Sequence, residues 1–130
     1  MKGRSILQSQ EGFTLIEIIA VLIILGILAA VAVPKYVDLM ANAERRALDA
    51  AVSELNGRET LTWSNIMLSA AGWASDAATF GAVDTDLGPD YTWGGGAPAA
   101  TGGTLTFGNQ SLALNRTAST ASSPGRWSTP

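Results

Sequence analysis

The chain of 130 residues contains no cysteine and no histidine. Without cysteine there is no disulfide and no thiol chemistry, and without histidine the commonest general base and metal ligand is missing. Lysine and arginine number 8 against 11 for aspartate and glutamate, so no nucleic-acid partner is expected. Serine and threonine are numerous, but none stands out as a nucleophile with a base. We therefore predict a single small non-enzymatic domain without a cofactor, and a small membrane-anchored enzyme is the alternative that a hydrolase screen would test.

Charge is also absent from a long stretch near the N-terminus. From Phe13 to Val33 the only ionisable side chain is Glu17. As a helix, this run would be about 30 Å long, which is the thickness of a bilayer's hydrocarbon core. A carboxylate within such a run is costly without a partner, and it therefore marks a functional site.

Three interpretations fit a short polar segment, residues 1–12, followed by a long apolar run. A signal peptidase would recognise a small-residue site, which Ala30-Val31-Ala32 matches, and would release a soluble domain that begins at Val33. A plain membrane anchor would leave Glu17 near the interface. A cut between Gly12 and Phe13 would instead create an α-amine four residues before Glu17, and that amine could neutralise the carboxylate of its own chain or of a neighbour.

The segment Gly12-Phe13-Thr14-Leu15-Ile16-Glu17, ahead of a long apolar helix, resembles the processing site of type IV prepilins and of the related pseudopilins of type II secretion. The resemblance covers residues 1 to about 55. It implies that residues 1–12 are a leader and that a prepilin peptidase cuts after Gly12 and methylates the amine of Phe13. It also implies that Glu17 neutralises the amine of an adjacent subunit during assembly.

The same resemblance implies a homo-oligomeric, pilus-like filament of which this chain is a structural subunit. The precursor would lie in the inner membrane, in contact with lipid, with its leader in the cytoplasm and its head in the periplasm. Its partners would be the prepilin peptidase and the inner-membrane assembly machinery, and the assembled filament would be extracellular or periplasmic. Many type IV pilins close a C-terminal loop with a disulfide. The absence of cysteine departs from that pattern and favours a secretion pseudopilin or a short minor subunit as the alternative, while a secreted binding domain released near Ala32 is the third possibility.

We expect an α+β fold in which residues 13–33 form the transmembrane or assembly helix and residues 34–71 continue it as an amphipathic helix. Gly26 and Pro34 fall where the family often has helix-loosening residues, and Pro34 predicts a kink or local melting. Asn56-Gly57 predicts a helix stop before a second helix at 59–71, although the first helix could run straight through. Arg45 with Asp49, and Glu54 with Arg58, have the spacing of helical ion pairs.

Residues 72–130 are expected to form a small glycine-rich β head and tail. Residues 104–107 and 111–115 alternate in period two around Gly108-Asn109-Gln110, which predicts a hairpin, and residues 91–93 would add a third strand. The tail, residues 117–130, is expected to be irregular, with Trp127 against the sheet. Asp84, Asp86 and Asp90 are weak calcium candidates, and a solvated turn is the favoured interpretation of the three.

Overall fold

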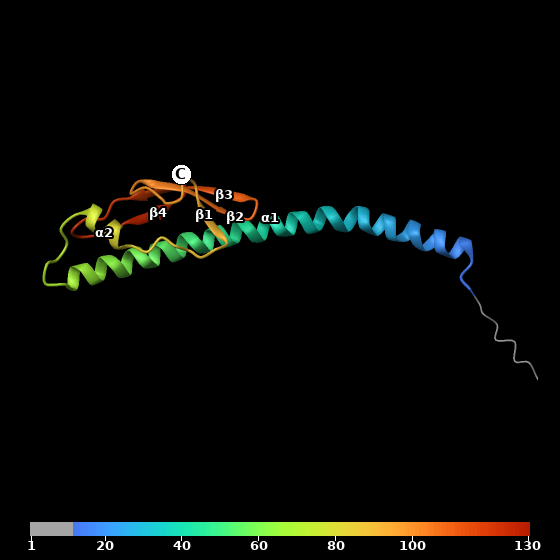
Figure 1. Ribbon diagram of the computed structural model, residues 1–130, viewed down its shortest axis with the longest axis horizontal. Helices are drawn as coiled ribbons and strands as arrows, with labels where there is room; N and C mark the ends of the chain where they lie inside the picture. Colours follow the sequence, from blue (N-terminus) through green and yellow to red (C-terminus); the bar gives the residue numbers. More distant parts are fainter. Residues whose placement is uncertain (1–11) are drawn as a thin grey trace, which may run out of the picture. The chain divides into compact units, whose positions relative to one another are not determined.

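The computed structural model describes residues 12–130, so the predicted leader lies outside the described residues except for Gly12. The chain is α+β, as predicted. Helices α1 (Leu15–Leu68) and α2 (Asp76–Ala82) precede the four strands of the sheet, β1 (Tyr91–Trp93), β2 (Gly102–Phe107), β3 (Gln110–Thr117) and β4 (Arg126–Ser128) (Figure 1). Two compact units divide the chain, one up to Asp38 and the other Leu39–Pro130.

The first unit is the N-terminal part of α1. Helix α1 is continuous across Gly26 and Pro34, although Pro34 cannot donate a hydrogen bond to the carbonyl four residues earlier. The predicted melting before Pro34 is therefore not present in the subunit by itself. Loosening of the helix at Gly26 and Pro34 within a filament stays a prediction.

In the second unit, α1 runs through Asn56 and Gly57 to Leu68. The predicted helix stop and the separate helix at 59–71 are wrong, and the alternative of one uninterrupted helix is correct. A glycine inside a helix costs roughly 1 kcal/mol relative to alanine, and the burial of Leu55 on the turn before it outweighs that cost. The side chain of Asn56 does not cap a helix end. It accepts a hydrogen bond from the backbone N–H of Trp127 at 2.7 Å and donates to the Trp127 carbonyl at 3.0 Å.

The sheet is antiparallel with the strand order β1-β2-β3-β4. Phe107 pairs with Gln110 at the end of the β2–β3 hairpin, so the turn consists of Gly108 and Asn109 alone, and Gln110 belongs to the strand. Gly108 has φ +58°, and a Cβ at this position would collide with the carboxylate of Glu44, so this turn requires glycine. The predicted hairpin and the third strand at 91–93 are confirmed.

The core lies between the sheet and the second half of α1, on the face that α1 turns toward β2, β3 and β4 (Figure 1). Its six members are buried apolar side chains at helical spacing on α1 and at inward positions on the strands: Leu48, Ala51, Leu55, Leu105, Leu114 and Trp127. The amphipathic stripe predicted on the helix therefore packs against the predicted hairpin.

Two elements were not predicted. Helix α2 begins after Ser75, whose Oγ accepts a hydrogen bond from the backbone N–H of Ala78 at 3.2 Å, an N-cap that stabilises a short helix. Strand β4 pairs with β3 from Thr117 opposite Arg126 to Asn115 opposite Ser128. The tail is thus not wholly irregular, but Trp127 is buried against the sheet, as expected, with 1% of its surface exposed.

Candidate assembly site and the ion-pair cluster of the head

The first turn of α1 holds Glu17 in a reciprocal pair of hydrogen bonds with Thr14. The backbone N–H of Thr14 donates to Glu17 Oε2 at 2.9 Å, and the backbone N–H of Glu17 donates to Thr14 Oγ1 at 3.3 Å. This is a capping box, in which the side chains at the two ends of the first turn satisfy each other's free backbone N–H groups. The sequence signal is a threonine three residues before a glutamate ahead of an apolar run. It was available in the sequence and was not used in the prediction.

The capping box partly answers the question that Glu17 raises. A carboxylate in the first turn of a helix is favoured by the unpaired N–H groups and the positive end of the helix dipole. Its charge is still not neutralised, because within residues 12–130 Glu17 forms no ion pair. Glu17 Oε1 also has no hydrogen-bond donor within these residues, so one oxygen of the carboxylate is available to a partner.

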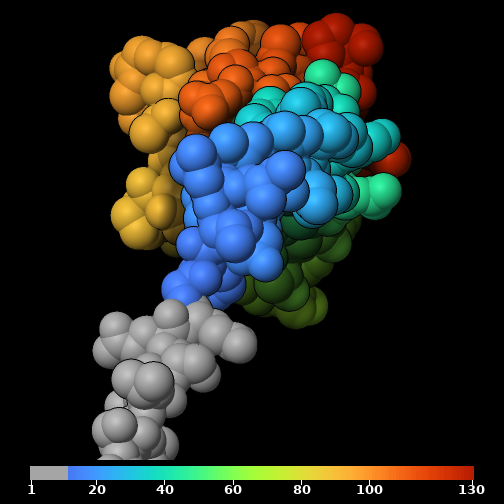
Figure 2. All heavy atoms as spheres, turned by 90° about the vertical axis from the view of Figure 1, so that its right-hand side faces the viewer, coloured from blue at the N-terminus to red at the C-terminus, as the bar shows by residue number. Residues whose placement is uncertain are grey.

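The apolar segment that follows is exposed all round. The most apolar 18-residue window of α1 has a mean hydropathy of 3.0, and none of it is buried within the chain. Figure 2 shows part of this segment in blue, viewed nearly along the helix. By length and composition α1 can cross a membrane, and among the described residues no other helix can. An apolar surface of this extent marks contact with lipid or with other proteins.

The second unit contains a buried cluster of charged side chains that joins four elements. Arg116 of β3 lies between Glu59 of α1 and Asp76 of α2. Its Nε and Nη2 donate to the two carboxylate oxygens of Glu59, and Nη1 and Nη2 donate to Asp76 at 3.0 and 2.9 Å. Nη1 also donates to the carbonyl of Ala100 at 3.1 Å. Trp127 of β4 donates its indole N–H to Glu59 Oε1 at 3.0 Å, so all members of the cluster are hydrogen-bonded.

The electrostatics of the cluster favour its charged form. The hydrogen bond from Arg116 is the largest effect on Asp76. Together with the bonds from the backbone N–H and hydroxyl of Ser119, it outweighs the effect of burial and lowers the pKa of Asp76 from 3.8 to about 2. Burial lowers the pKa of Arg116, but the hydrogen bonds to Glu59 and Asp76 more than compensate and raise it overall. The Phe80 ring, 4.7 Å from the guanidinium carbon of Arg116, adds a cation–π contact. With Arg116 and Glu59 closed to solvent, we interpret the cluster as structural.

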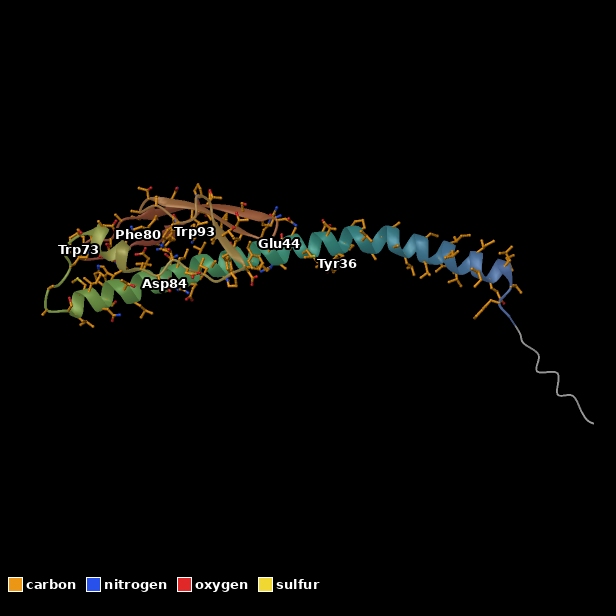
Figure 3. All side chains as sticks on the ribbon, in the orientation of Figure 1. Tyr36, Glu44, Trp73, Phe80, Asp84 and Trp93 are labelled. Atoms are coloured by element: carbon orange, nitrogen blue, oxygen red, sulfur yellow. The ribbon has the colours of Figure 1, made fainter. Side chains whose placement is uncertain are left out.

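Glu59, Asp76 and Arg116 were not predicted as functional or structural sites, although the sequence pattern at two of them indicates burial. Arg116 continues the inward alternation of Leu112 and Leu114, and Glu59 follows Leu55 by one helical turn on the buried stripe. Opposite charges at two apolar-phase positions indicate a buried pair. Phe80, whose ring lies against the guanidinium group of Arg116, is labelled in Figure 3.

Of the two ion pairs predicted on α1, one is present and the other is not. Glu54 and Arg58 form the expected ion pair at 2.8 Å, whereas Arg45 donates to Gln110 at 3.2 Å instead of pairing with Asp49. This is a correction: the hairpin end offers Arg45 a hydrogen-bond acceptor that the helix alone does not.

The calcium candidates lie in the loop before β1. Asp84 Oδ1 and Asp86 Oδ1 accept the backbone N–H groups of Asp86 and Gly88, each at 2.9 Å, as in turns. Arg58 donates to the carbonyls of Asp84 and Asp86 at 3.0 and 2.7 Å. Across residues 12–130 no three acidic side chains gather as a metal site, so the geometry gives the calcium prediction no support.

Known proteins resemble this chain both in its N-terminal segment and over most of its length. Residues 7–33 match the family model described as the prokaryotic N-terminal methylation motif. Fimbrial protein Q of Moraxella bovis is 34% identical over 122 residues, which cover 80% of this chain and 73% of that protein. The type IV narrow pilus major component of Thermus thermophilus is 31% identical over 83 residues, 57% of this chain and 72% of that protein.

The chain therefore belongs to the type IV pilin family. A fimbrial protein of Pseudomonas aeruginosa is 44% identical over 61 residues, but this match covers 47% of the chain and only 38% of the relative. The chain thus spans well under half the length of that relative. No solved structure gives a significant match.

Proposed function

We propose that the protein is a structural subunit of a type IV pilus-like filament, made as a prepilin, cleaved after Gly12 and methylated on the amine of Phe13. The observation that carries the proposal is the exposed apolar segment of α1. It has an acid held in its first turn, and Gly12-Phe13 lie just before the helix. Relatives named fimbrial protein or pilus component support the pilus over a secretion pseudopilin.

In this proposal, the new amine of Phe13 on one subunit pairs with Glu17 of its neighbour. The capping box keeps the carboxylate at the helix start and leaves Oε1 free to accept from that amine. Removing an unpaired carboxylate from water costs several kcal/mol, and an ion pair recovers the cost only with good hydrogen-bond geometry. Pairing would therefore favour the one axial position at which each Glu17 meets an amine.

The apolar segment would have two successive environments. Before assembly it would lie in the lipid of the inner membrane, with the leader in the cytoplasm. During assembly the machinery of the inner membrane would lift it into a bundle of identical helices. The segment has an apolar surface on all sides, and this suits both environments. A second copy of the chain, the prepilin peptidase and the assembly machinery are then the partners, and the head remains outside the membrane.

The processing step is tested by the intact mass and N-terminal sequence of the native protein. We expect a chain that begins at Phe13 and carries the mass of one added methyl group. Gly12→Val should leave the leader attached, while Gly3→Val, the same change inside the leader, should be processed normally. A native N-terminus at Val33 would overturn the proposal and support release of a soluble domain, and normal maturation of Gly12→Val would remove the assigned cleavage position.

A further inference from the structure

The sheet of the head has a single free charge. From Tyr91 to Pro130 the only charged side chains are Arg116 and Arg126. Arg116 is buried in the cluster described above. Arg126, the first residue of β4, is exposed and forms no ion pair with any residue from 12 to 130. Arg126 therefore places an unpaired positive side chain at the β4 edge of the sheet.

The opposite edge of the sheet is negative. The loop that leads into β1 carries Asp84, Asp86 and Asp90, all exposed, and Figure 3 labels Asp84. Arg58 lies 3.5 Å from the carboxylate of Asp84, and it is the one cation that pairs with this loop in the described chain. Asp90 has no ion pair there. Because β1 and β4 are the two outer strands of the sheet, the acidic loop and Arg126 lie at opposite edges and cannot neutralise each other within one subunit.

A cleft with polar side chains lies beside Arg126. Its volume is about 480 Å³, and it lies between α1 and the loop that enters β4. The lining includes Thr60, Thr117, Ser123 and Arg126, and no acidic residue. The hydroxyl of Thr60 donates to the carbonyl of Asn56 at 2.9 Å, and the hydroxyls of Ser123 and Thr120 are hydrogen-bonded to each other at 2.8 Å. A guanidinium group without an ion pair, beside a polar cleft that no acidic residue lines, is suited to bind a carboxylate.

We propose that the cleft beside Arg126 binds the acidic loop, residues 84–90, of a second copy of this chain, with Asp90 as the residue that meets Arg126. This inference rests on the proposed filament and names a lateral contact within it. The charges on the two edges are complementary, and each subunit carries one of each. Such a contact joins two different surfaces, so it repeats from subunit to subunit and does not close as a two-fold dimer; in the proposed filament it forms an open helical array.

Charge exchange tests the contact in full-length protein in a host that assembles the filaments. Arg126→Asp and Asp90→Arg should each lower the amount of sheared filament, by roughly fivefold or more since the weakened contact repeats along the array. The double variant, which has the parent's net charge, should restore most of it. Arg126→Gln should also lower the yield. Ala113→Glu is the matched control for Arg126→Gln, because it also lowers the net charge by one, on the exposed outer face of β3, and it should leave the yield unchanged. Failure of the double variant to recover would overturn the inference.

The absence of cysteine from the chain allows a second, direct test. In oxidised filaments, Ser123→Cys combined with Asp90→Cys should give a ladder of disulfide-linked multimers, whereas either variant alone should stay monomeric. Filaments that form normally but give no ladder would overturn this inference and leave the proposed function intact. If the parent chain forms no filament at all, both fail. A ladder limited to dimers would show a closed pair and would also overturn the inference.

Discussion

The change Asp76→Asn tests the ion-pair cluster most cleanly. The side chain of Asp76 is 23% exposed, and it accepts two hydrogen bonds from Arg116 and two from Ser119. Asparagine has nearly the same shape and keeps one oxygen as an acceptor, but it carries no charge. Because the packing of α2 against the sheet is preserved, the measured difference reports the charge interaction with Arg116 together with the one hydrogen bond that the amide nitrogen cannot accept.

The magnitude follows from the pKa of Asp76, which Arg116 and, to a smaller extent, the hydrogen bonds from Ser119 lower from 3.8 to about 2. Each pKa unit corresponds to about 1.4 kcal/mol, so the charged form of Asp76 contributes about 2 kcal/mol to the free energy of unfolding. The folded-state pKa is below the unfolded one, so this stability is fully present above the unfolded value. It is lost as the pH falls from 3.8 toward about 2. At neutral pH the substitution should lower the melting temperature by about 10 °C.

The assay is unfolding of the full-length chain in detergent, followed by tryptophan fluorescence, since Trp127 and Trp93 contact each other in the core with ring centroids 5.5 Å apart. Asp76→Asn should be less stable than the parent at neutral pH, and the two should converge as the pH approaches about 2. Asp49→Asn is the matched control, because Asp49 is exposed on α1 and has no ion pair within residues 12–130. A constant difference between parent and Asp76→Asn across this pH range would refute the reasoning.

Three further substitutions have distinct expected outcomes. Arg116→Met leaves Glu59 buried without a cation and should cost about 3–5 kcal/mol in the same unfolding assay; a cost below that of Asp76→Asn would contradict this. Gly57→Ala should stabilise the head by about 0.5–1 kcal/mol, because the helix is continuous there and a Cβ would meet nothing within 4 Å; a loss of stability would indicate that the helix breaks at Gly57 in solution. Glu17→Gln keeps an acceptor for the Thr14 N–H but removes the charge. It should be cleaved normally yet lower filament yield by roughly tenfold or more, as counted by electron microscopy, and a parental yield would exclude the pairing role.

The parts of the fold that the sequence predicts are those encoded by neighbouring residues. The β2–β3 hairpin has alternating apolar residues on both sides of a glycine-containing turn, and partners in such a hairpin are close in sequence. The N-terminal helix follows from an uninterrupted apolar run. The helix end predicted at Asn56-Gly57 is wrong because the tendency of these two residues to end a helix is weak. The contacts that override it come from Trp127, which lies 71 residues further along the chain than Asn56.

The cluster in the head could not be predicted in the same way. Glu59 and Arg116 are separated by 57 residues, and Asp76 and Arg116 by 40. Their pairing depends on the packing of α1, α2 and β3 together. Period analysis can show that Glu59 and Arg116 lie at buried positions, but it cannot select Asp76 from the exposed aspartates that follow it. That choice depends on the N-cap at Ser75, which begins α2 and fixes where Asp76 points.

Glu17 illustrates how far one residue can be interpreted from sequence. Its isolation among apolar residues indicates that it needs a partner, but it does not say that the partner is a cation. The structure supplies a partial answer within the chain, since Thr14 donates its backbone N–H to one carboxylate oxygen. Capping of the helix start and pairing with an amine can be separated experimentally. Thr14→Ala removes the hydroxyl of the capping box and keeps the charge of Glu17, whereas Glu17→Gln keeps the hydrogen-bond acceptor and removes the charge. If capping were the whole role of Glu17, Glu17→Gln would leave the filament yield nearly unchanged, because glutamine still accepts from the Thr14 N–H. If Glu17 also pairs with an amine, Glu17→Gln should reduce it far more.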